Sequence, residues 1–205
     1  VKCYNKTMDI KDAKKLIALA RESIKTEFEN KEPFVEEDIK TKFSKPQGVF
    51  TTLNTYKDHQ LRGCIGFVEA RYPLWLGVIY TARLAAFKDP RFEPLKKEEL
   101  ENIVIELSIL TTPKRIIPDP RYICIGRDGL IVKYGKISGL LLPQVATEYN
   151  MNWETFLQHT CLKAGLPRDC YKNPQVEVYS FSAEVYKELS PNGDVVKEES
   201  FSCGT

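Results

Sequence analysis

Apolar positions recur with helical spacing in several parts of the chain. From Asp9 to about Glu29 they fall every three or four residues, with lysines and glutamates between them, which predicts one amphipathic helix. Pro73 opens a second long apolar run, because proline fits the first turn of a helix, and the Asp89-Pro90 step ends it. The predicted helical segments are residues 9–29, 36–43, 73–87, 96–100 and 143–164.

Other parts of the chain have the short β-branched or alternating runs that are typical of strands. The longest of these apolar runs, residues 103–110, indicates a strand in the centre of a sheet. The polar segment 54–60 separates two further runs and predicts a hairpin with a long connection. Asp128-Gly129 and Tyr134-Gly135 are predicted turns. The predicted strands are residues 49–53, 61–68, 103–110, short segments within 122–142, and 176–189.

Helical segments interspersed with antiparallel strands predict an α+β fold, a mainly antiparallel sheet with flanking helices. No repeat, low-complexity linker or charge block divides the sequence. We therefore expect a single domain over residues 1–205, with room for two closely packed lobes. Residues 190–205 follow the last predicted strand and include the turn Pro191-Asn192-Gly193, so we expect a loosely held C-terminal tail there.

Composition and charge narrow the class of protein without giving its function. Of the 205 residues, 42% are hydrophobic and 28% are charged, as in an ordinary globular protein. Lysines and arginines number 30 and aspartates and glutamates 28, so the formal net charge is +2 and attracts neither nucleic acid nor an anionic membrane strongly. Neither the N-terminus nor a later segment has the apolar length of a secretory signal or a membrane span, and we predict a cytoplasmic protein.

The cysteines do not form a recognisable metal or redox motif. All six are scattered, without the Cys-x-x-Cys spacing of zinc sites and dithiols, so reduced thiols are the expected state. A bridge between Cys3 and Cys203 stays open, because sequence does not give the distance between them. With two histidines, and without the loops that bind nucleotides or the helix motif of zinc proteases, we expect no metal site and no cofactor.

The segment Leu61-Arg62-Gly63-Cys64-Ile65-Gly66 is the strongest candidate for chemistry. In a strand, Arg62 and Cys64 share a face with Cα atoms about 6.6 Å apart, so the guanidinium can favour the reactive thiolate. Gly63 and Gly66 lack side chains, which lets a ligand or another backbone approach the strand closely. The alternative is packing alone, with Cys64 a small buried apolar residue.

Glu106 interrupts the apolar run 103–110, and a buried carboxylate needs a partner. Arg62 on a neighbouring strand could bind it through two parallel hydrogen bonds. That pairing would neutralise the charge acting on Cys64, which would make the pair structural. The alternative is that Glu106 faces water at a sheet edge.

The loop Asp89-Pro90-Arg91-Phe92-Glu93-Pro94 is held rigid by two prolines and carries both charge signs. It could present Arg91 to an anionic ligand, or it could end a helix with a surface ion pair. His59 and His159 are weaker candidates for a base beside Cys64, because only the fold could bring either histidine there.

These segments together resemble the AMMECR family, named after a candidate region in a syndrome of Alport disease, midface hypoplasia and elliptocytosis. Similar blocks occur in the same order at residues 48–53, 61–66, 89–94, 106–110, 139–145 and 156–167. The resemblance implies an α+β fold with a larger and a smaller lobe and a cleft near the Leu61–Gly66 motif. It also implies Memo-type or radical-SAM proteins as partners. The motif residues that it brings forward are Arg62, Cys64, Asp89, Arg91, Glu106 and Gln144.

Two functions from different classes are compatible with these residues. One is an enzyme, or an enzyme subunit in a modification pathway, that acts on a small anionic or carbonyl substrate. The other is a non-catalytic adaptor, whose strand and glycines form a groove for a peptide or a protein. Nucleic-acid binding ranks third, because lysines alternate with acids and no aromatic platform accompanies them. For the enzyme, the predicted catalytic residues are Cys64 and Glu106, and the predicted substrate-binding residues are Arg62, Gly63, Gly66, Asp89, Arg91 and Gln144.

Overall fold

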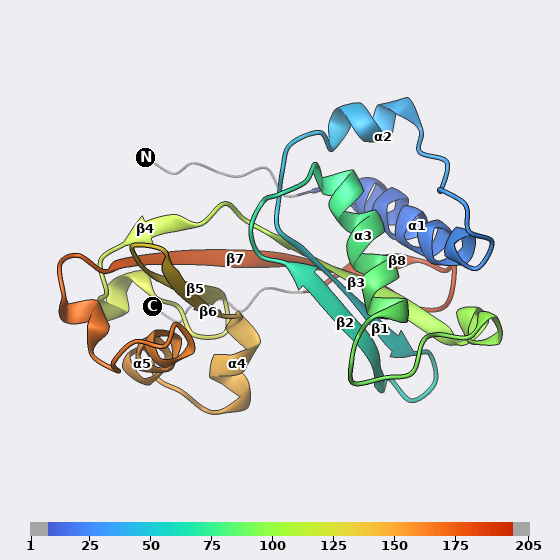
Figure 1. Ribbon diagram of the computed structural model, residues 1–205. Helices are drawn as coiled ribbons and strands as arrows, with labels where there is room; N and C mark the ends of the chain where they lie inside the picture. The colour runs from blue at the N-terminus through green and yellow to red at the C-terminus, as the bar shows by residue number, and fades with distance from the viewer. Residues whose placement is uncertain (1–7, 199–205) are drawn as a thin grey trace. The chain divides into compact units, whose positions relative to one another are not determined.

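The structure is a computed structural model that describes residues 8–198 (Figure 1). It contains two compact units. Among the described residues, the first unit comprises 8–110 and 184–198, and the second comprises 111–183. Each unit has its own hydrophobic core, and one long strand, β7 (Glu177–Glu188), contributes residues to both units.

Helices are interspersed with antiparallel strands along the chain, and the predicted α+β class with flanking helices is confirmed. The helices are α1 (Ile10–Glu27), α2 (Glu37–Lys42), α3 (Leu74–Phe87), α4 (Pro143–Glu148) and α5 (Trp153–Lys163), with short 3-10 helices η1 (Lys97–Asn102), η2 (Pro120–Tyr122) and η3 (Cys170–Lys172). Besides β7, the strands are β1 (Val49–Thr55), β2 (Leu61–Phe67), β3 (Ile103–Leu110), β4 (Lys114–Ile116), β5 (Asp128–Tyr134), β6 (Ile137–Leu141) and β8 (Val195–Lys197).

In the first unit, the strands hydrogen-bond in the order β2-β1-β3-β7-β8, and α1 and α3 pack on one face of this sheet (Figure 1). Alternation along β1 and β3 decides which side chains face the helices. Leu53 and Ile105 are fully buried on that side, and the Thr51 hydroxyl lies 2.8 Å from the hydroxyl of Thr81 in α3. The intervening residues of β1 and β3 therefore point to the opposite face.

A buried ion pair ties α1 to the sheet of the first unit. Arg21 donates from Nε to Glu188 at 3.2 Å and from its other nitrogens to the carbonyl oxygens of Leu100 and Ile103, at 2.8 and 2.9 Å. Glu188 also accepts the backbone N–H of Ile105 at 2.9 Å. Both charges are thus removed from water with several hydrogen-bond partners, the arrangement in which a buried ion pair is tolerated.

The second unit has a smaller core, in which α4 and α5 pack against β5 and β6. Its strands follow the order β4-β7-β5-β6. A disulfide joins Cys161 in α5 to Cys170 in η3. The expectation of reduced thiols is wrong for this pair, because the chain reversal after α5 brings two cysteines together that no spacing motif marks. The possible bridge between Cys3 and Cys203 lies outside the described residues.

Most predicted elements are present, with differences in the meander and near the C-terminus. Tyr134-Gly135 is a turn, as predicted, and Gly135 has φ +57°. Asp128-Gly129 is not a turn but the start of β5, where buried Asp128 accepts the N–H of Cys124 at 2.8 Å. The predicted loose tail contains β8, paired with β7 up to residue 197, and its remainder from 199 lies outside the described residues. No helix among residues 8–198 is long and apolar enough to cross a membrane.

Candidate functional site

Three side chains form a row across the face of the first unit's sheet that is turned away from α1 and α3. Thr52 in β1 pairs with Cys64 in β2 on one side and with Glu106 in β3 on the other. Directly paired residues of neighbouring strands point to the same side, so the three side chains share this face. We call Cys64, Thr52 and Glu106 the polar row. Two strand spacings place the Cα atoms of its ends about 10 Å apart.

Cys64 is a free, half-buried cysteine whose sulfur has a hydrogen-bond donor beside it. The Thr52 hydroxyl donates to Cys64 Sγ at 3.2 Å. This contact joins β1 and β2 through their side chains, on the same face of the sheet as Glu106. Thr52 was not singled out from the sequence, although the strand predicted over 49–53 already contains it.

Glu106 is half-buried, and no hydrogen bond or ion pair joins its carboxylate to another group in residues 8–198. Burial raises the pKa of this carboxyl above its ordinary value, and the negative charge of Glu198 raises it further. Lys187 opposes the shift in part. Glu106 therefore holds a proton to higher pH than an ordinary glutamate. The alternative of an edge position is wrong, because β3 lies between β1 and β7.

The predicted pairing of Arg62 with Glu106 is wrong. Arg62 instead binds Glu99 of η1 through two hydrogen bonds, from Nε at 2.7 Å and from Nη2 at 3.0 Å. Its third nitrogen donates to the carbonyl oxygen of Glu93 at 3.0 Å. The reason is topological: β2 is an edge strand, so its arginine reaches outward to η1, whereas Glu106 lies two strands inward beyond β1. Arg62 also holds the pKa of the Glu99 carboxyl below its ordinary value.

Asp89 and Arg91 close the outer edge of β2 at Cys64. The buried carboxylate of Asp89 accepts the backbone N–H of Cys64 at 2.8 Å, and Arg91 donates to the Cys64 carbonyl oxygen at 3.3 Å. The two side chains also bind each other, at 3.0 and 2.7 Å. The Arg91 guanidinium is the main reason that the pKa of Asp89 lies well below its ordinary value. Residues 89–91 therefore cover the edge of β2 at Cys64, so that no further strand can pair with it there.

The two glycines of the motif have packing reasons. A Cβ on Gly63 would lie 2.1 Å from the carbonyl oxygen of Ala85 in α3, and a Cβ on Gly66 would lie 2.2 Å from the ring of Phe50. Close approach of backbone to backbone and of ring to backbone therefore requires glycine at both positions. Arg62 and Arg91 each form an ion pair with a nearby carboxylate. Their guanidinium groups also lie near the Phe92 ring, at 6.0 and 5.5 Å from its centre.

The remaining candidates are not part of the polar row. His59 lies in the β1–β2 connection with φ +50°, and His159 and exposed Gln144 belong to the second unit, on α5 and α4. Glu99, the actual partner of Arg62, was missed because its contact depends on how η1 lies along the sheet edge. The cleft and the partners that the resemblance implies stay predictions.

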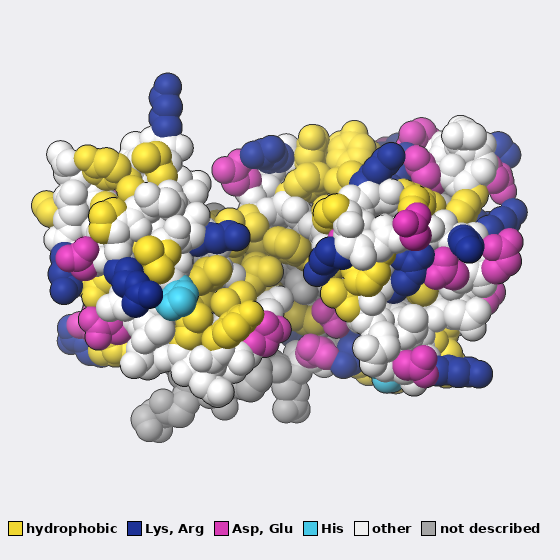
Figure 2. All heavy atoms as spheres, turned by 60° about the horizontal axis from the view of Figure 1, so that its bottom comes forward, with side chains coloured by type: hydrophobic (Ala, Val, Ile, Leu, Met, Phe, Trp, Pro, Cys, Tyr) yellow, Lys and Arg dark blue, Asp and Glu magenta, His cyan; other side chains and the backbone are white. Residues whose placement is uncertain are grey.

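Charge on the visible surface is mixed. Figure 2 shows Lys and Arg side chains interspersed with Asp and Glu over the face that it presents.

One family model matches the chain, and proteins of known sequence or structure are similar to it over most of its length. A family model described as AMMECR1 matches residues 17–186. A protein of Aquifex aeolicus is 49% identical over 188 residues, 90% of this chain and 96% of that protein. Protein TV1384 of Thermoplasma volcanium is 46% identical, over 88% and 92% of the two chains. The crystal structure of the uncharacterized protein PH0010 from Pyrococcus horikoshii is similar with a TM-score of 0.79 and 43% identity, covering 93% of this chain and 98% of that one.

Proposed function

The chain belongs to the AMMECR1 family, and we propose that it is a thiol-dependent enzyme, or the catalytic subunit of one, that acts on a carbonyl substrate at the polar row. The single observation that carries this proposal is the hydrogen bond from Thr52 to Cys64 Sγ in a row that ends at Glu106. The row combines a nucleophile, a hydroxyl group hydrogen-bonded to its sulfur, and a carboxyl group whose pKa is raised by burial.

Cys64 is the proposed nucleophile. Its sulfur attacks the carbonyl carbon of a substrate that lies over Thr52, and a thioester to Cys64 forms as the leaving group departs. The edge contacts of Asp89 and Arg91 fix the backbone of Cys64 on both its N–H and its carbonyl side, which makes them positioning residues. Such fixation matters because small displacements of a nucleophile lower its rate strongly.

Glu106 is the proposed acid and base at the far end of the row. Its raised pKa keeps the carboxyl protonated to a higher pH, so that it can give a proton to the leaving group. Once ionised, the same carboxylate can take a proton from the water that hydrolyses the thioester. Its Cα separation from Cys64, about 10 Å, leaves space for a small substrate group between the two side chains.

The charges around β2 favour a neutral carbonyl substrate over an anionic one. Arg62 and Arg91 are both compensated by carboxylates, Glu99 and Asp89, at hydrogen-bond distance. An anion would have to displace one of these carboxylates, at the cost of a charge-assisted hydrogen bond. An adaptor that pairs a peptide with this edge has less support, because the outward N–H and carbonyl of Cys64 are already bonded.

Acyl transfer from a simple ester tests the proposal. We expect p-nitrophenyl acetate to acetylate Cys64 at pH 7 at least about tenfold faster than it acetylates N-acetylcysteine, with the adduct located by mass spectrometry. Thr52→Val and Glu106→Gln should each slow the reaction severalfold. Ser108→Ala, on the same face of β3 but outside the row, is the matched control and should not. A rate at Cys64 no higher than that of N-acetylcysteine would refute the proposal.

A further inference from the structure

The same four-residue motif occurs once in each unit. It consists of aspartate, proline, arginine and an aromatic residue, at positions 89–92 in the first unit and 119–122 in the second. We call these segments the first and the second Asp-Pro-Arg turn. The first turn covers the edge of β2, as described above, whereas the second follows β4 in the smaller unit.

The two turns have the same internal hydrogen bonds. In each, aspartate Oδ1 accepts the N–H of the arginine, at 3.1 Å in the first turn and 2.9 Å in the second. The aspartate carbonyl oxygen accepts the N–H of the aromatic residue, at 3.1 and 3.0 Å. Arginine Nε and Nη2 donate to the same carboxylate, at 3.0 and 2.7 Å and at 2.8 and 2.8 Å. Each turn therefore holds a carboxylate and a guanidinium side by side through local contacts alone.

The first turn binds one residue of extended backbone. Asp89 Oδ2 accepts the N–H of Cys64 at 2.8 Å, and Arg91 Nη2 donates to the carbonyl oxygen of Cys64 at 3.3 Å. Both side chains keep their hydrogen bonds to each other while they do so. An ion pair within the turn is thus compatible with binding of a main chain, because each group has hydrogen-bonding capacity left.

The second turn has the same groups, but they face the solvent. The side chain of Asp119 is 26% exposed against 2% for Asp89, and that of Arg121 is 78% exposed against 54% for Arg91. Within residues 8–198, the carboxylate of Asp119 is bonded to Arg121 alone. The atoms that correspond to those on Cys64 therefore have no main-chain partner in the described part of the chain.

We propose that the second Asp-Pro-Arg turn, residues 119–122, binds an extended backbone segment of a partner protein in the way that residues 89–92 bind β2. Asp119 accepts the N–H of one residue of that segment, and Arg121 donates to the carbonyl oxygen of the same residue. These contacts involve main-chain groups, so they select an extended conformation. The inference is independent of the proposed chemistry, because the turn contains no residue of the polar row.

The aromatic residue of the turn adds a preference for positive charge in the partner. In the first turn, the centre of the Phe92 ring lies 6.0 Å from the guanidinium carbon of Arg62, two residues before Cys64. Tyr122 has the same position in the second turn, and its side chain is 48% exposed. We therefore expect an arginine or lysine two residues before the bound residue to lie over the Tyr122 ring.

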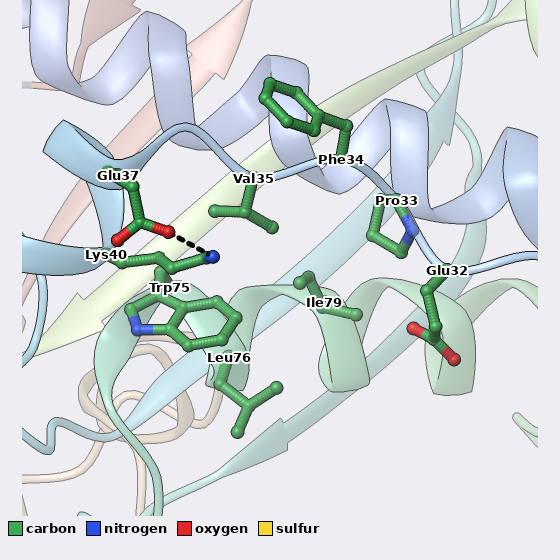
Figure 3. A pocket seen from close by; sticks show the side chains of 9 residues that line it. All are labelled: Glu32, Pro33, Phe34, Val35, Glu37, Lys40, Trp75, Leu76 and Ile79. Carbon is green, nitrogen blue, oxygen red and sulfur yellow. Dashed lines mark hydrogen bonds and ion pairs between the residues drawn. The ribbon is translucent and has the colours of Figure 1, made fainter.

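The apolar groove between α3 and residues 32–37 is a weaker candidate, although its volume is about 430 Å³. Figure 3 shows Val35 extending toward Trp75 across it. The charged groups at this groove are compensated within the chain, for example Glu37 by Lys40. Its lining therefore does not distinguish one class of ligand from another, whereas the first Asp-Pro-Arg turn shows what the second can bind.

A peptide with the sequence of β2 is the direct probe, because β2 is the segment that the first turn binds. It contains residues 61–67 with the change Cys64→Ser and has blocked ends. Added to the full chain labelled with ¹⁵N, it should shift the backbone amide signals of Arg121 and Tyr122, with a dissociation constant of about 1 mM. The same peptide with a methyl group on the backbone nitrogen of the changed residue lacks the N–H for Asp119 and should bind at least about fivefold more weakly.

Variants of the chain separate the turn from unspecific binding. Asp119→Ala and Arg121→Ala should each weaken the peptide at least about fivefold, because each removes one of the two main-chain contacts. Arg115→Ala is the matched control, since it removes another exposed arginine ion pair of the same unit, and it should bind as the parent does. The amide spectrum of each variant also shows whether it is folded. In the peptide, Arg62→Glu should weaken binding as well.

Three results would overturn the proposal: no shift of the Arg121 and Tyr122 amides, an undiminished affinity of the methylated peptide, or an undiminished affinity in both Asp119→Ala and Arg121→Ala. Shifts confined to Cys64 and Arg91 would mean that the peptide displaces β2, and would also overturn it. So would self-association of the peptide-free protein that Arg121→Ala abolishes, measured by sedimentation, because a second copy would then be the partner. Acetylation of Cys64 should be the same in these variants, which keeps this test separate from that of the proposed function.

Discussion

The two units stabilise their cores in different ways. In the first unit, α1 and α3 pack on a sheet of five strands, and Arg21 forms a buried, hydrogen-bonded ion pair with Glu188. The second has a smaller core and closes it with the disulfide between Cys161 and Cys170. In the first unit, Cys64 is a free thiol that accepts a hydrogen bond from Thr52, whereas in the second unit the core residue Cys161 forms a disulfide. Surroundings, more than residue type, decide what a cysteine does here.

Each unit contains one tryptophan, Trp75 in α3 and Trp153 in α5, so single-tryptophan variants follow their unfolding separately. If the units rest on different interactions, a change in one should first affect its own tryptophan. The following predictions test that difference, in decreasing order of expected effect.

Loss of the buried ion pair should have the largest effect. Arg21→Met leaves Glu188 buried without its charged partner, which we expect to lower the free energy of unfolding by about 3–5 kcal/mol. Urea unfolding followed by Trp75 fluorescence measures this. Lys14→Met, at an exposed position of the same helix, is the control and should change it by less than about 0.5 kcal/mol. A loss that only Trp153 reports would contradict the division into two units.

Removal of the disulfide should destabilise the second unit. In a background with Cys161→Ala and Cys170→Ala, we expect a loss of about 2–3 kcal/mol, because the unfolded chain regains the entropy of a short loop. The transition reported by Trp153 should shift, while that of Trp75 should not. Cys64→Ala, which removes a cysteine without removing a disulfide, should leave both transitions unchanged within about 1 kcal/mol.

One glycine in each unit allows a strand to approach a helix closely, and the pair makes a symmetrical test. A Cβ on Gly63 would lie 2.1 Å from the Ala85 carbonyl oxygen, and one on Gly139 would lie 2.2 Å from the Ala164 nitrogen. Replacement by alanine should cost about 1–3 kcal/mol at each site, because backbone atoms must shift. Gly63→Ala should move the Trp75 transition and Gly139→Ala that of Trp153. If Gly63→Ala shifted the Trp153 transition instead, and Gly139→Ala that of Trp75, the division into two units would be contradicted.

Acid should weaken the first unit through Asp89. Its pKa is held low, first by Arg91 and then by backbone N–H groups, so its ionised form stabilises the folded state. That stability is complete at neutral pH and declines as the pH falls below about 4, the value of an unfolded aspartate, toward the lower folded pKa. Asp89→Asn should remove this acid dependence from the Trp75 transition and cost about 1–2 kcal/mol at pH 7. If the stability of Asp89→Asn declined in acid as that of the parent does, Asp89 would not be the source of this decline.

The sequence predicted the long elements well because their patterns are strong. The apolar run 103–110 gave a central strand, and the spacing from Asp9 gave α1 within two residues at its C-terminal end. The three-residue strands β4 and β8 are too short to show a pattern, and their pairing with β7 comes from contacts distant in sequence. The order of the strands, likewise, could not be derived from local patterns.

The candidate site was predicted in part. The alternation of side chains along each strand predicted which face of its own strand Cys64 and Glu106 occupy. Only the pairing of β1 with β2 and β3 shows that Thr52 lies between them. The predicted partner of Arg62 was wrong. A carboxylate within an apolar strand needs a partner, which favoured Glu106, but Glu99 lies across the open edge of β2 and binds Arg62 instead. Contacts that depend on register and on edge packing have no signature in a single sequence.

The most direct test of the central claim is the rate at which iodoacetamide alkylates Cys64 at pH 7 in the folded protein, relative to the same cysteine in urea. The account predicts faster alkylation in the folded state, with most of the advantage lost in Thr52→Val, because the hydroxyl that is hydrogen-bonded to Cys64 Sγ is then absent. Slower alkylation in the folded state than in urea, or a rate that Thr52→Val leaves unchanged, would contradict a reactive site at the polar row.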